Sequence, residues 1–202
     1  MSAPKEFPPE KVRIVVAEVM TLLKEKGESV CVAETVRTVL YLFDKGVTGW
    51  SKKIANRRLC VQAAGGIISA SMLSTSGASK FYKGGLTLYT LESRIAFAGW
   101  TQDNISTYRG PTTDIVAGLA SNVRPKLGAT YCICESGTAG PTGGDTPNRT
   151  PGYVALAVAT EKGVYKKELS TGLGGDREGN MIAFAAEALG LLRDVLKGDA
   201  KL

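Results

Sequence analysis

Two separated stretches, VAET (32–35) and AAGGIISA (63–70), decide the fold of this chain. Residues 29–33 form a short β-rich run that is typical of a buried strand, and residues 65–74 have the composition of a helix that begins on two glycines. We interpret the two stretches as halves of one strand-to-helix turn, separated by residues 36–62. Such a turn presents backbone N–H groups to an anion or a developing oxyanion, so we expect the active site there.

Length and composition indicate one globular domain spanning residues 1–202. The 202 residues are 44% hydrophobic and 22% charged, which suits a sizeable core. No apolar run reaches the ~18 to 20 residues of a membrane span, and the N-terminal residues lack the apolar stretch of a signal peptide. We therefore expect a cytoplasmic protein with no membrane partner.

The four cysteines lack the paired CxxC spacing of a zinc site, and three of them fall in apolar strand-like runs. We interpret those three as buried thiols in a reducing compartment. No metal site is predicted, and no cofactor is expected.

The net charge of +6 raises the possibility of nucleic-acid binding, so its location matters. Residues 36–62 contain six basic side chains and a single acidic one, Asp44, which gives this segment a net charge of +5. The remainder of the chain therefore carries about +1. Because the basic character belongs to one segment, nucleic acid is not expected as a partner of the domain.

Hydrophobic periodicity predicts an α/β domain. Helical spacing covers residues 9–26, 92–98, 112–127 with an interruption near Pro125, and 180–196. Strand-like runs cover 84–91 and 129–135, and a hairpin is predicted from 153–160 and 164–169. Residues 136–152 are rich in glycine and proline and are predicted to form a loop. Strands mixed with helices indicate a single domain with a mixed β-sheet flanked by helices.

The residues available for catalysis are restricted, because the chain contains no histidine. A Ser-His or Cys-His nucleophile is therefore excluded. Thr35, at the end of a strand and before the glycine turn, is the best-placed hydroxyl, although a threonine there also serves as a helix cap. The loop SGTAGPTGG (136–144) is suited to cradling a phosphate, with a plain glycine loop as the alternative. Arg177 precedes the last helix and is suited to gripping a phosphate, with an Asp176 helix cap and a solvated arginine as the alternative.

Four motifs in this order resemble the CinA C-terminal domain family, whose bacterial members include the nicotinamide mononucleotide deamidases. They are VAET plus AAGGIISASMLS (63–74), GASKFYKGGLTLYTLESR (77–94), ESGTAGPTGG (135–144) and GGDR (174–177). Joining residues 33–35 to residues 63–66 reproduces the length and the glycines of the family motif AESCTGG. The resemblance covers nearly the whole chain outside residues 36–62.

The resemblance implies an amidohydrolase that releases ammonia from the carboxamide of a small, phosphate-bearing ligand such as a pyridine nucleotide. It also implies a homodimer. Carried over by position, the catalytic residues are Thr35, Tyr89 and Arg94, in place of the family's serine, tyrosine and lysine. The residues implied for substrate binding are Ala64, Gly65, Gly66, Ser136, Gly137, Thr138, Gly140 and Arg177.

Two of these positions depart from the family. Threonine is a competent nucleophile, but its methyl group restricts χ1 and crowds the attack. The guanidinium of Arg94 remains protonated and cannot accept a proton from the nucleophile. Tyr89 or Lys83 would have to supply the base. We therefore weigh a hydrolase against a nucleotide-binding module of the same fold that has lost its turnover.

Residues 36–62 are predicted to be an insert at the site itself. Val36 with Arg37 is compatible with the codons GTACGT, Ala55 with Asn56 with GCTAAC, and Gln62 with CAG. These are the donor, branch point and acceptor of an intron, and 27 codons keep the frame. Our hypothesis is a retained intron in a eukaryotic, fungal gene. The alternatives are a lid and a basic partner-binding arm, the latter predicting an interaction protein with salt-sensitive binding to nucleic acid.

Overall fold

The computed structural model describes residues 6–35 and 64–202, so the predicted insert at 36–62 lies outside the described residues. The described chain forms a five-stranded sheet in the order β2-β1-β3-β4-β5. The strands are β1 (Val30–Thr35), β2 (Tyr82–Leu88), β3 (Tyr131–Gly137), β4 (Tyr153–Ala159) and β5 (Val164–Ser170). β1 runs parallel to both β2 and β3, whereas β4 is antiparallel to β3 and to β5. The predicted mixed sheet in a single α/β domain is confirmed.

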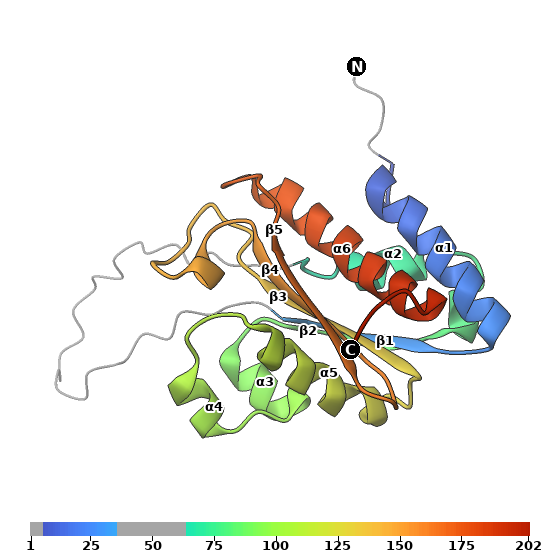
Figure 1. The fold of residues 1–202 in the computed structure, drawn as a ribbon, viewed down its shortest axis with the longest axis horizontal. Coiled ribbons are helices and arrows are strands. Elements are labelled where there is room, and N and C mark those ends of the chain that lie inside the picture. Colours follow the sequence, from blue (N-terminus) through green and yellow to red (C-terminus); the bar gives the residue numbers. More distant parts are fainter. Residues whose placement is uncertain (1–5, 36–63) are drawn as a thin grey trace, which may run out of the picture.

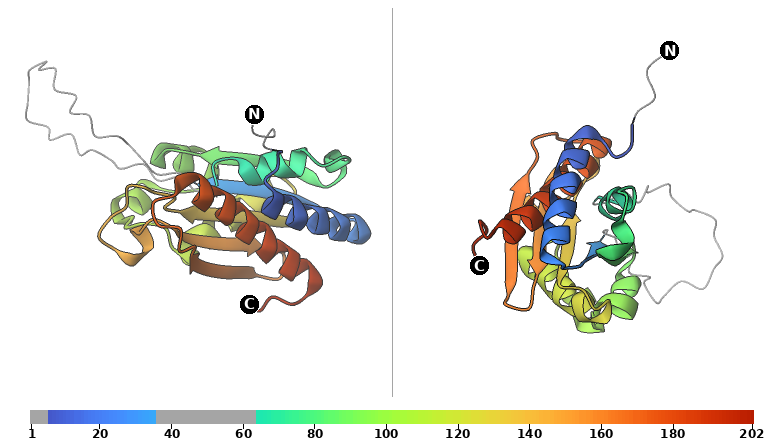
Figure 2. Two further views of the ribbon diagram at one scale, coloured as in Figure 1. Left: turned by 90° about the horizontal axis from the view of Figure 1, so that it is seen from above. Right: turned by 90° about the vertical axis from the view of Figure 1, so that its right-hand side faces the viewer.

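Helices cover both faces of the sheet (Figure 1). One face carries α1 (Glu10–Lys26), α2 (Ile67–Leu73) and α6 (Arg177–Lys197), and the other carries α3 (Leu91–Ala98), α4 (Gln102–Thr107) and α5 (Thr113–Lys126). Figure 2 shows α1 and α6 lying side by side across the first face. Within the described ranges, no helix has the length and apolarity needed to cross a membrane.

The core consists of two apolar clusters, one on each side of the sheet. Val30, Val32 and Ile133 point to the face of α1, α2 and α6. The alternate residues of the same strands point to the face of α5. These include three free thiols, all buried: Cys31, Cys132 and Cys134. The buried thiols predicted for the strand-like runs are therefore confirmed.

Several helices and strands begin or end at other residues than predicted, because side chains cap the helix starts. Thr90 and Ser93 form a capping box that starts α3 at Leu91, so β2 ends at Leu88 rather than at residue 91. A second box, formed by Thr101 and Asn104, starts α4, a helix that the hydrophobic periodicity did not predict. Local side-chain hydrogen bonds to orphan N–H groups, which hydrophobic periodicity does not report, set these starts.

Two more predicted boundaries differ from the structure. The helix predicted over 112–127 runs through Pro125 to Lys126, because the proline falls in its last turn. The last helix begins at Arg177 rather than at residue 180. Asp176 is its cap, accepting a hydrogen bond from the Gly179 N–H at 3.1 Å.

The first helix provides a test of the core. Leu23 is fully buried between α1 and the sheet, whereas Ile14 on the same helix is 59% exposed. We expect Leu23→Ala to lower the free energy of unfolding by about 2 to 5 kcal/mol, because it removes buried methyl groups and leaves a cavity. The matched Ile14→Ala should change it by less than about 0.5 kcal/mol. Urea denaturation of both variants measures the difference, and equal losses would contradict this packing.

Candidate active site

The candidate site lies where the carboxyl ends of β1 and β3 meet. The chain leaves β1 toward α2 and β2 on one side, and leaves β3 toward β4 on the other. In open α/β sheets, ligands bind outside the carboxyl ends of strands whose connections leave in opposite directions. Thr35 pairs in register with Ser136 on β3 and with Leu88 on β2. The strand register therefore brings the VAET stretch, the glycine-rich loop and the end of β2 to one edge.

The Thr35 hydroxyl is held by the backbone of the neighbouring strand. Thr35 is fully buried, and its Oγ1 donates a hydrogen bond to the main-chain carbonyl oxygen of Glu135 at 3.1 Å. Strand alternation places Thr35 and Ser136 on the face of α3 and α5, as a continuation of the row that contains Ala33 and Cys134. The predicted nucleophile is thus fixed at the edge of the sheet, with its proton directed at a carbonyl.

The glycine turn before α2 is bound to two side chains of the same domain. The Gly66 N–H donates to Glu34 Oε2, the Ser69 N–H donates to Glu34 Oε1 at 3.2 Å, and the Ala64 N–H donates to Glu135 Oε1 at 2.9 Å. Gly65 and Gly66 adopt φ values of 64° and 94°, which a side chain would strain. Two of the N–H groups predicted to bind a ligand are therefore engaged by carboxyl oxygens, which a ligand would have to displace.

Glu34 and Glu135 are both completely buried. Burial raises the pKa of Glu34, against the hydrogen bonds from Gly66 and Ser69. Burial also raises the pKa of Glu135 well above its ordinary value, and the charge of Glu34 raises it further, against the Ala64 N–H and Arg94. Neither glutamate was predicted as a site residue, although Glu34 directly follows the strand-like run 29–33 and Glu135 ends the run 129–135, and acidic residues are rarely buried.

Arg94 is completely buried and lies against two aromatic rings. Its guanidinium carbon is 4.8 Å from the centroid of the Trp100 ring and 5.1 Å from that of Tyr108, and the two rings meet edge to face at 5.4 Å. Cation–π contacts of this kind fix a guanidinium in place. Because the charge of Arg94 lowers the pKa of both Cys134 and Glu135, the cation acts on the end of β3. Sequence reasoning predicted Arg94 but missed the two aromatic residues.

The two residues considered as bases lie at different levels of the sheet. Tyr89 follows the end of β2 directly and is 39% exposed, so it lies at the same edge as Thr35. Lys83 is the second residue of β2, five positions before the partner of Thr35, or about 16 Å along the strand. The hypothesis that Lys83 supplies the base is therefore wrong.

The loop after β3 is held by the start of α6. Ser136 and Gly137 are the last residues of β3 rather than loop residues, and Thr138 is fully buried. Arg177 Nη1 donates to the Gly140 carbonyl oxygen at 2.7 Å, and Asn180 Nδ2 donates to the Ala139 carbonyl oxygen at 2.9 Å. Arg177 therefore braces the loop that was predicted to bind phosphate, and the Asp176 cap considered as its alternative is present. Asn180, which shares this bracing, was not predicted.

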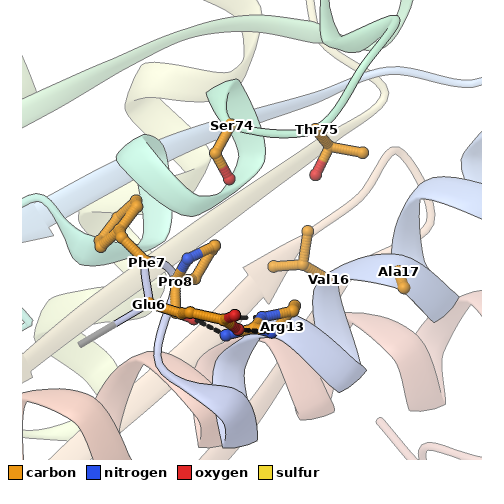
Figure 3. Close-up of a pocket in the computed structure, with 8 residues that line it drawn as sticks. All are labelled: Glu6, Phe7, Pro8, Arg13, Val16, Ala17, Ser74 and Thr75. Carbon is orange, nitrogen blue, oxygen red and sulfur yellow. Dashed lines mark hydrogen bonds and ion pairs between the residues drawn. The ribbon is translucent and has the colours of Figure 1, made fainter. Parts of the chain in front are cut away.

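Two hollows on the surface differ in the residues that line them. One of about 500 Å³ is lined by α4 and the facing ends of α3 and α5, and it includes Trp100, Tyr108 and Asn122. The other, about 470 Å³, lies between the N-terminal residues, α1 and the end of α2 (Figure 3). In the second hollow Arg13 is paired with Glu6 and bonded to the Pro8 carbonyl oxygen. The first hollow is lined by the two aromatic residues that contact Arg94, whereas no residue of the candidate site lines the second.

Comparison with known proteins agrees with this architecture. A family model described as CinA C-terminal domain matches residues 42–196, a range that begins inside the 36–62 segment. A CinA-like protein of Dictyoglomus thermophilum is 30% identical over 182 residues, covering 84% of this chain and 44% of that protein. A putative competence-damage inducible protein of Thermoanaerobacter is 32% identical over 134 residues, covering 66% and 32% respectively. The chain thus spans less than half the length of these curated relatives.

Solved structures share the fold. The competence/damage inducible protein CihA from Agrobacterium tumefaciens superposes with a TM-score of 0.74 at 20% identity, covering 95% of this chain and 99% of that one. A CinA superfamily protein from Escherichia coli gives a TM-score of 0.72 at 16% identity, covering 96% and 99%. With the family match over most of its length, and a site at the carboxyl ends of β1 and β3 built from the motifs noted above, the chain belongs to the CinA C-terminal domain family.

Proposed function

We propose that this chain is an amidohydrolase that cleaves the carboxamide C–N bond of a small, phosphate-bearing ligand, with nicotinamide mononucleotide as the type of substrate. The observation that carries the proposal is the position of Thr35, whose buried hydroxyl lies at the carboxyl edge of the sheet opposite Ser136. Arg94 supplies a fixed positive charge near the end of β3. A hydroxyl at the same end of the sheet as a fixed cation is suited to attack on a carbonyl group.

The reaction follows from these groups in two steps. Thr35 Oγ1 attacks the carboxamide carbon, the C–N bond breaks, and the hydroxyl proton passes to the nitrogen, which leaves as ammonia. Water then adds to the resulting threonyl ester, the ester bond breaks, and the hydroxyl is restored with release of the carboxylic acid product. Arg94 stabilises the negative charge that develops on the carbonyl oxygen in both steps. Tyr89, exposed at the same edge, is the proposed proton relay.

The phosphate of the ligand is assigned to the glycine-rich loop after β3. Gly140 has a φ of 88°, and its Cβ position would lie 3.2 Å from the Cα of Gly175, so the loop packs closely on the segment before α6. Arg177 donates through Nη1 to this loop, which keeps its guanidinium beside the proposed phosphate position. Arg177 thus orders the loop through its Nη1 donor, and its other N–H donors are the ones proposed to bind the phosphate.

A second function, nucleotide binding without turnover, is favoured by a specific observation. The Ala64 and Gly66 N–H groups donate to Glu135 and Glu34, so they are already engaged where an oxyanion would need them. Arg94 also stays protonated and cannot accept the hydroxyl proton. Calorimetry with nicotinamide mononucleotide separates the functions, because a binding module gives heat of binding without ammonia release.

Replacement of Thr35 tests the nucleophile. We expect Thr35→Ala to abolish ammonia release from nicotinamide mononucleotide, and Thr35→Ser to retain it, since serine keeps the hydroxyl and removes the methyl group that restricts χ1. Thr21→Ala is the matched control, because the exposed Thr21 hydroxyl also donates to a main-chain carbonyl oxygen, at 2.9 Å, on the remote helix α1. A coupled ammonia assay measures all three. Activity of Thr35→Ala equal to that of the wild type would exclude Thr35 as the nucleophile.

Replacement of Arg94 tests the fixed cation. We expect Arg94→Met to lower the rate of ammonia release about 100-fold, because it removes the charge that stabilises the oxyanion. Arg94→Lys should keep or exceed wild-type activity, since it retains the charge and restores an amine that exchanges protons. Arg109→Met is the control, because Arg109 is exposed and bonds only to the carbonyl oxygens of Ser106 and Tyr108 among the described residues. Circular dichroism checks folding, and an unchanged rate in Arg94→Met would remove Arg94 from the site.

A further inference from the structure

Two buried carboxyl groups face each other beneath the candidate site. Glu34 on β1 and Glu135 on β3 are partners in register, and paired residues of neighbouring strands lie about 4.8 Å apart. Both side chains are completely buried. By alternation they lie on the face of α2 and α6, opposite to the face that holds Thr35. Two negative charges at this separation in a buried place repel strongly, so the pair favours a state that retains one proton.

The hydrogen bonds of the two groups are unequal. Glu34 accepts bonds from the Gly66 N–H, the Ser69 N–H at 3.2 Å and Ser69 Oγ at 3.5 Å. Glu135 accepts one, from the Ala64 N–H to Oε1 at 2.9 Å, while its Oε2 is buried without a hydrogen-bond partner in the described part of the chain. Donors stabilise an ionised carboxylate, and an unpartnered buried oxygen disfavours one. The retained proton therefore belongs on Glu135, and the negative charge on Glu34.

The charged and titratable groups around Glu135 agree with this assignment. Glu34 faces it from β1 and Arg94 acts on it from α3, while Cys134 adjoins it on β3 itself. Tyr82 on β2 faces Glu34 rather than Glu135. Burial raises the pKa of Glu135, the charge of Glu34 raises it further, and the Ala64 N–H and Arg94 oppose them without reversing the direction.

Glu135 also connects the two parts of the site. Its main-chain carbonyl oxygen accepts the bond from Thr35 Oγ1, and its side chain accepts the bond from the Ala64 N–H. We propose that Glu135 is a positioning residue that acts as a neutral carboxylic acid and holds the α2 turn at the carboxyl ends of β1 and β3 while Glu34 stays ionised. The positioning of Thr35 for catalysis rests on the proposed hydrolase function, whereas the proton on Glu135 and the anchoring of Ala64 do not. Ionisation of Glu135 would place two negative charges on neighbouring strands, and their repulsion would loosen the α2 turn.

The proton on Glu135 is tested without reference to activity. We expect the infrared spectrum of the wild type at pH 7 to contain a carbonyl band of a protonated carboxylic acid that is lost in Glu135→Gln. The band should persist in Glu25→Gln, the control, because Glu25 is exposed on α1. In Glu34→Gln the opposing charge is gone, so the band should disappear at a lower pH than in the wild type. Absence of the band from the wild type, or its survival in Glu135→Gln, would overturn the assignment.

The positioning role is tested by hydrogen exchange of the Ala64 amide. The neutral form is present below the raised pKa of Glu135 and is lost as the pH rises through it, so wild-type protection of this amide, corrected for intrinsic exchange, should fall as the pH rises through that pKa. Glu135→Gln stays neutral and keeps an acceptor oxygen, so its protection should persist. In Glu135→Ala the protection of the Ala64 amide should be at least about tenfold lower than in the neutral form of the wild type, at every pH. Equal protection in all three proteins would overturn the proposal.

Ammonia release provides the last comparison. Glu135→Gln should keep wild-type activity within about tenfold and extend it to higher pH, and Glu135→Ala should lose about 100-fold. A purely structural glutamate would not shift the alkaline limb of the pH profile, so an unshifted limb in Glu135→Gln would count against the role. If the wild type releases no ammonia, the hydrolase function fails, while the infrared and exchange results still decide the state of Glu135 and its hold on Ala64.

Discussion

The hydrogen bonds between the α2 turn and two buried glutamates are the constraint on which the site depends. A helix start leaves backbone N–H groups without partners, and here Glu34 and Glu135 satisfy the groups of Gly66 and Ala64. Because the glutamates come from adjacent strands, their bonds anchor one turn to both β1 and β3. The same arrangement buries two carboxyl groups completely, which is costly unless donors and a retained proton compensate it. The order of the α2 turn and the proposed neutral state of Glu135 thus have the same cause, which is the burial of the two glutamates that bond to the turn.

The fold was largely predictable from the sequence, because strand and helix periodicity and the order of glycine-rich turns are local signals. The predicted strand end at VAET and the predicted helix start at AAGGIISA are both present, with β1 ending at Thr35 and α2 beginning at Ile67, since strand ends and helix starts are encoded close to where they occur. The boundaries at Leu88 and Arg177 were missed by about three residues, because caps from Thr90 and Asp176 decide them. Periodicity does not register a single side chain bonded to a backbone N–H group.

The candidate site was predictable in position but not in its contacts. Thr35 and Arg94 were selected by motifs, yet nothing in the motifs shows that Trp100 and Tyr108 lie against the guanidinium, because these two residues lie outside all four motifs. The role of Glu135 depends on its register partner, Glu34, which is 101 positions away in the sequence. Such pairs exist only once the strand order is fixed. The sequence alone also could not show that Lys83 lies at the wrong end of β2.

In the proposed reaction, arginine at position 94 restricts where the proton of the Thr35 hydroxyl can go. A lysine in that position would accept it for part of the reaction, whereas a guanidinium held against two aromatic rings contributes charge and geometry alone. The proposed hydrolase would then move the proton through Tyr89 or directly to the departing nitrogen, and it would have to keep the carboxyl pair of Glu34 and Glu135 from adding a second negative charge. A neutral Glu135 meets the second condition, because the net charge of Arg94, Glu34 and Glu135 is then zero. With both glutamates ionised it would be −1, and the cation would be partly cancelled where an oxyanion needs it. In the proposed hydrolase, the arginine at position 94 and the proton retained on Glu135 therefore belong to one electrostatic arrangement.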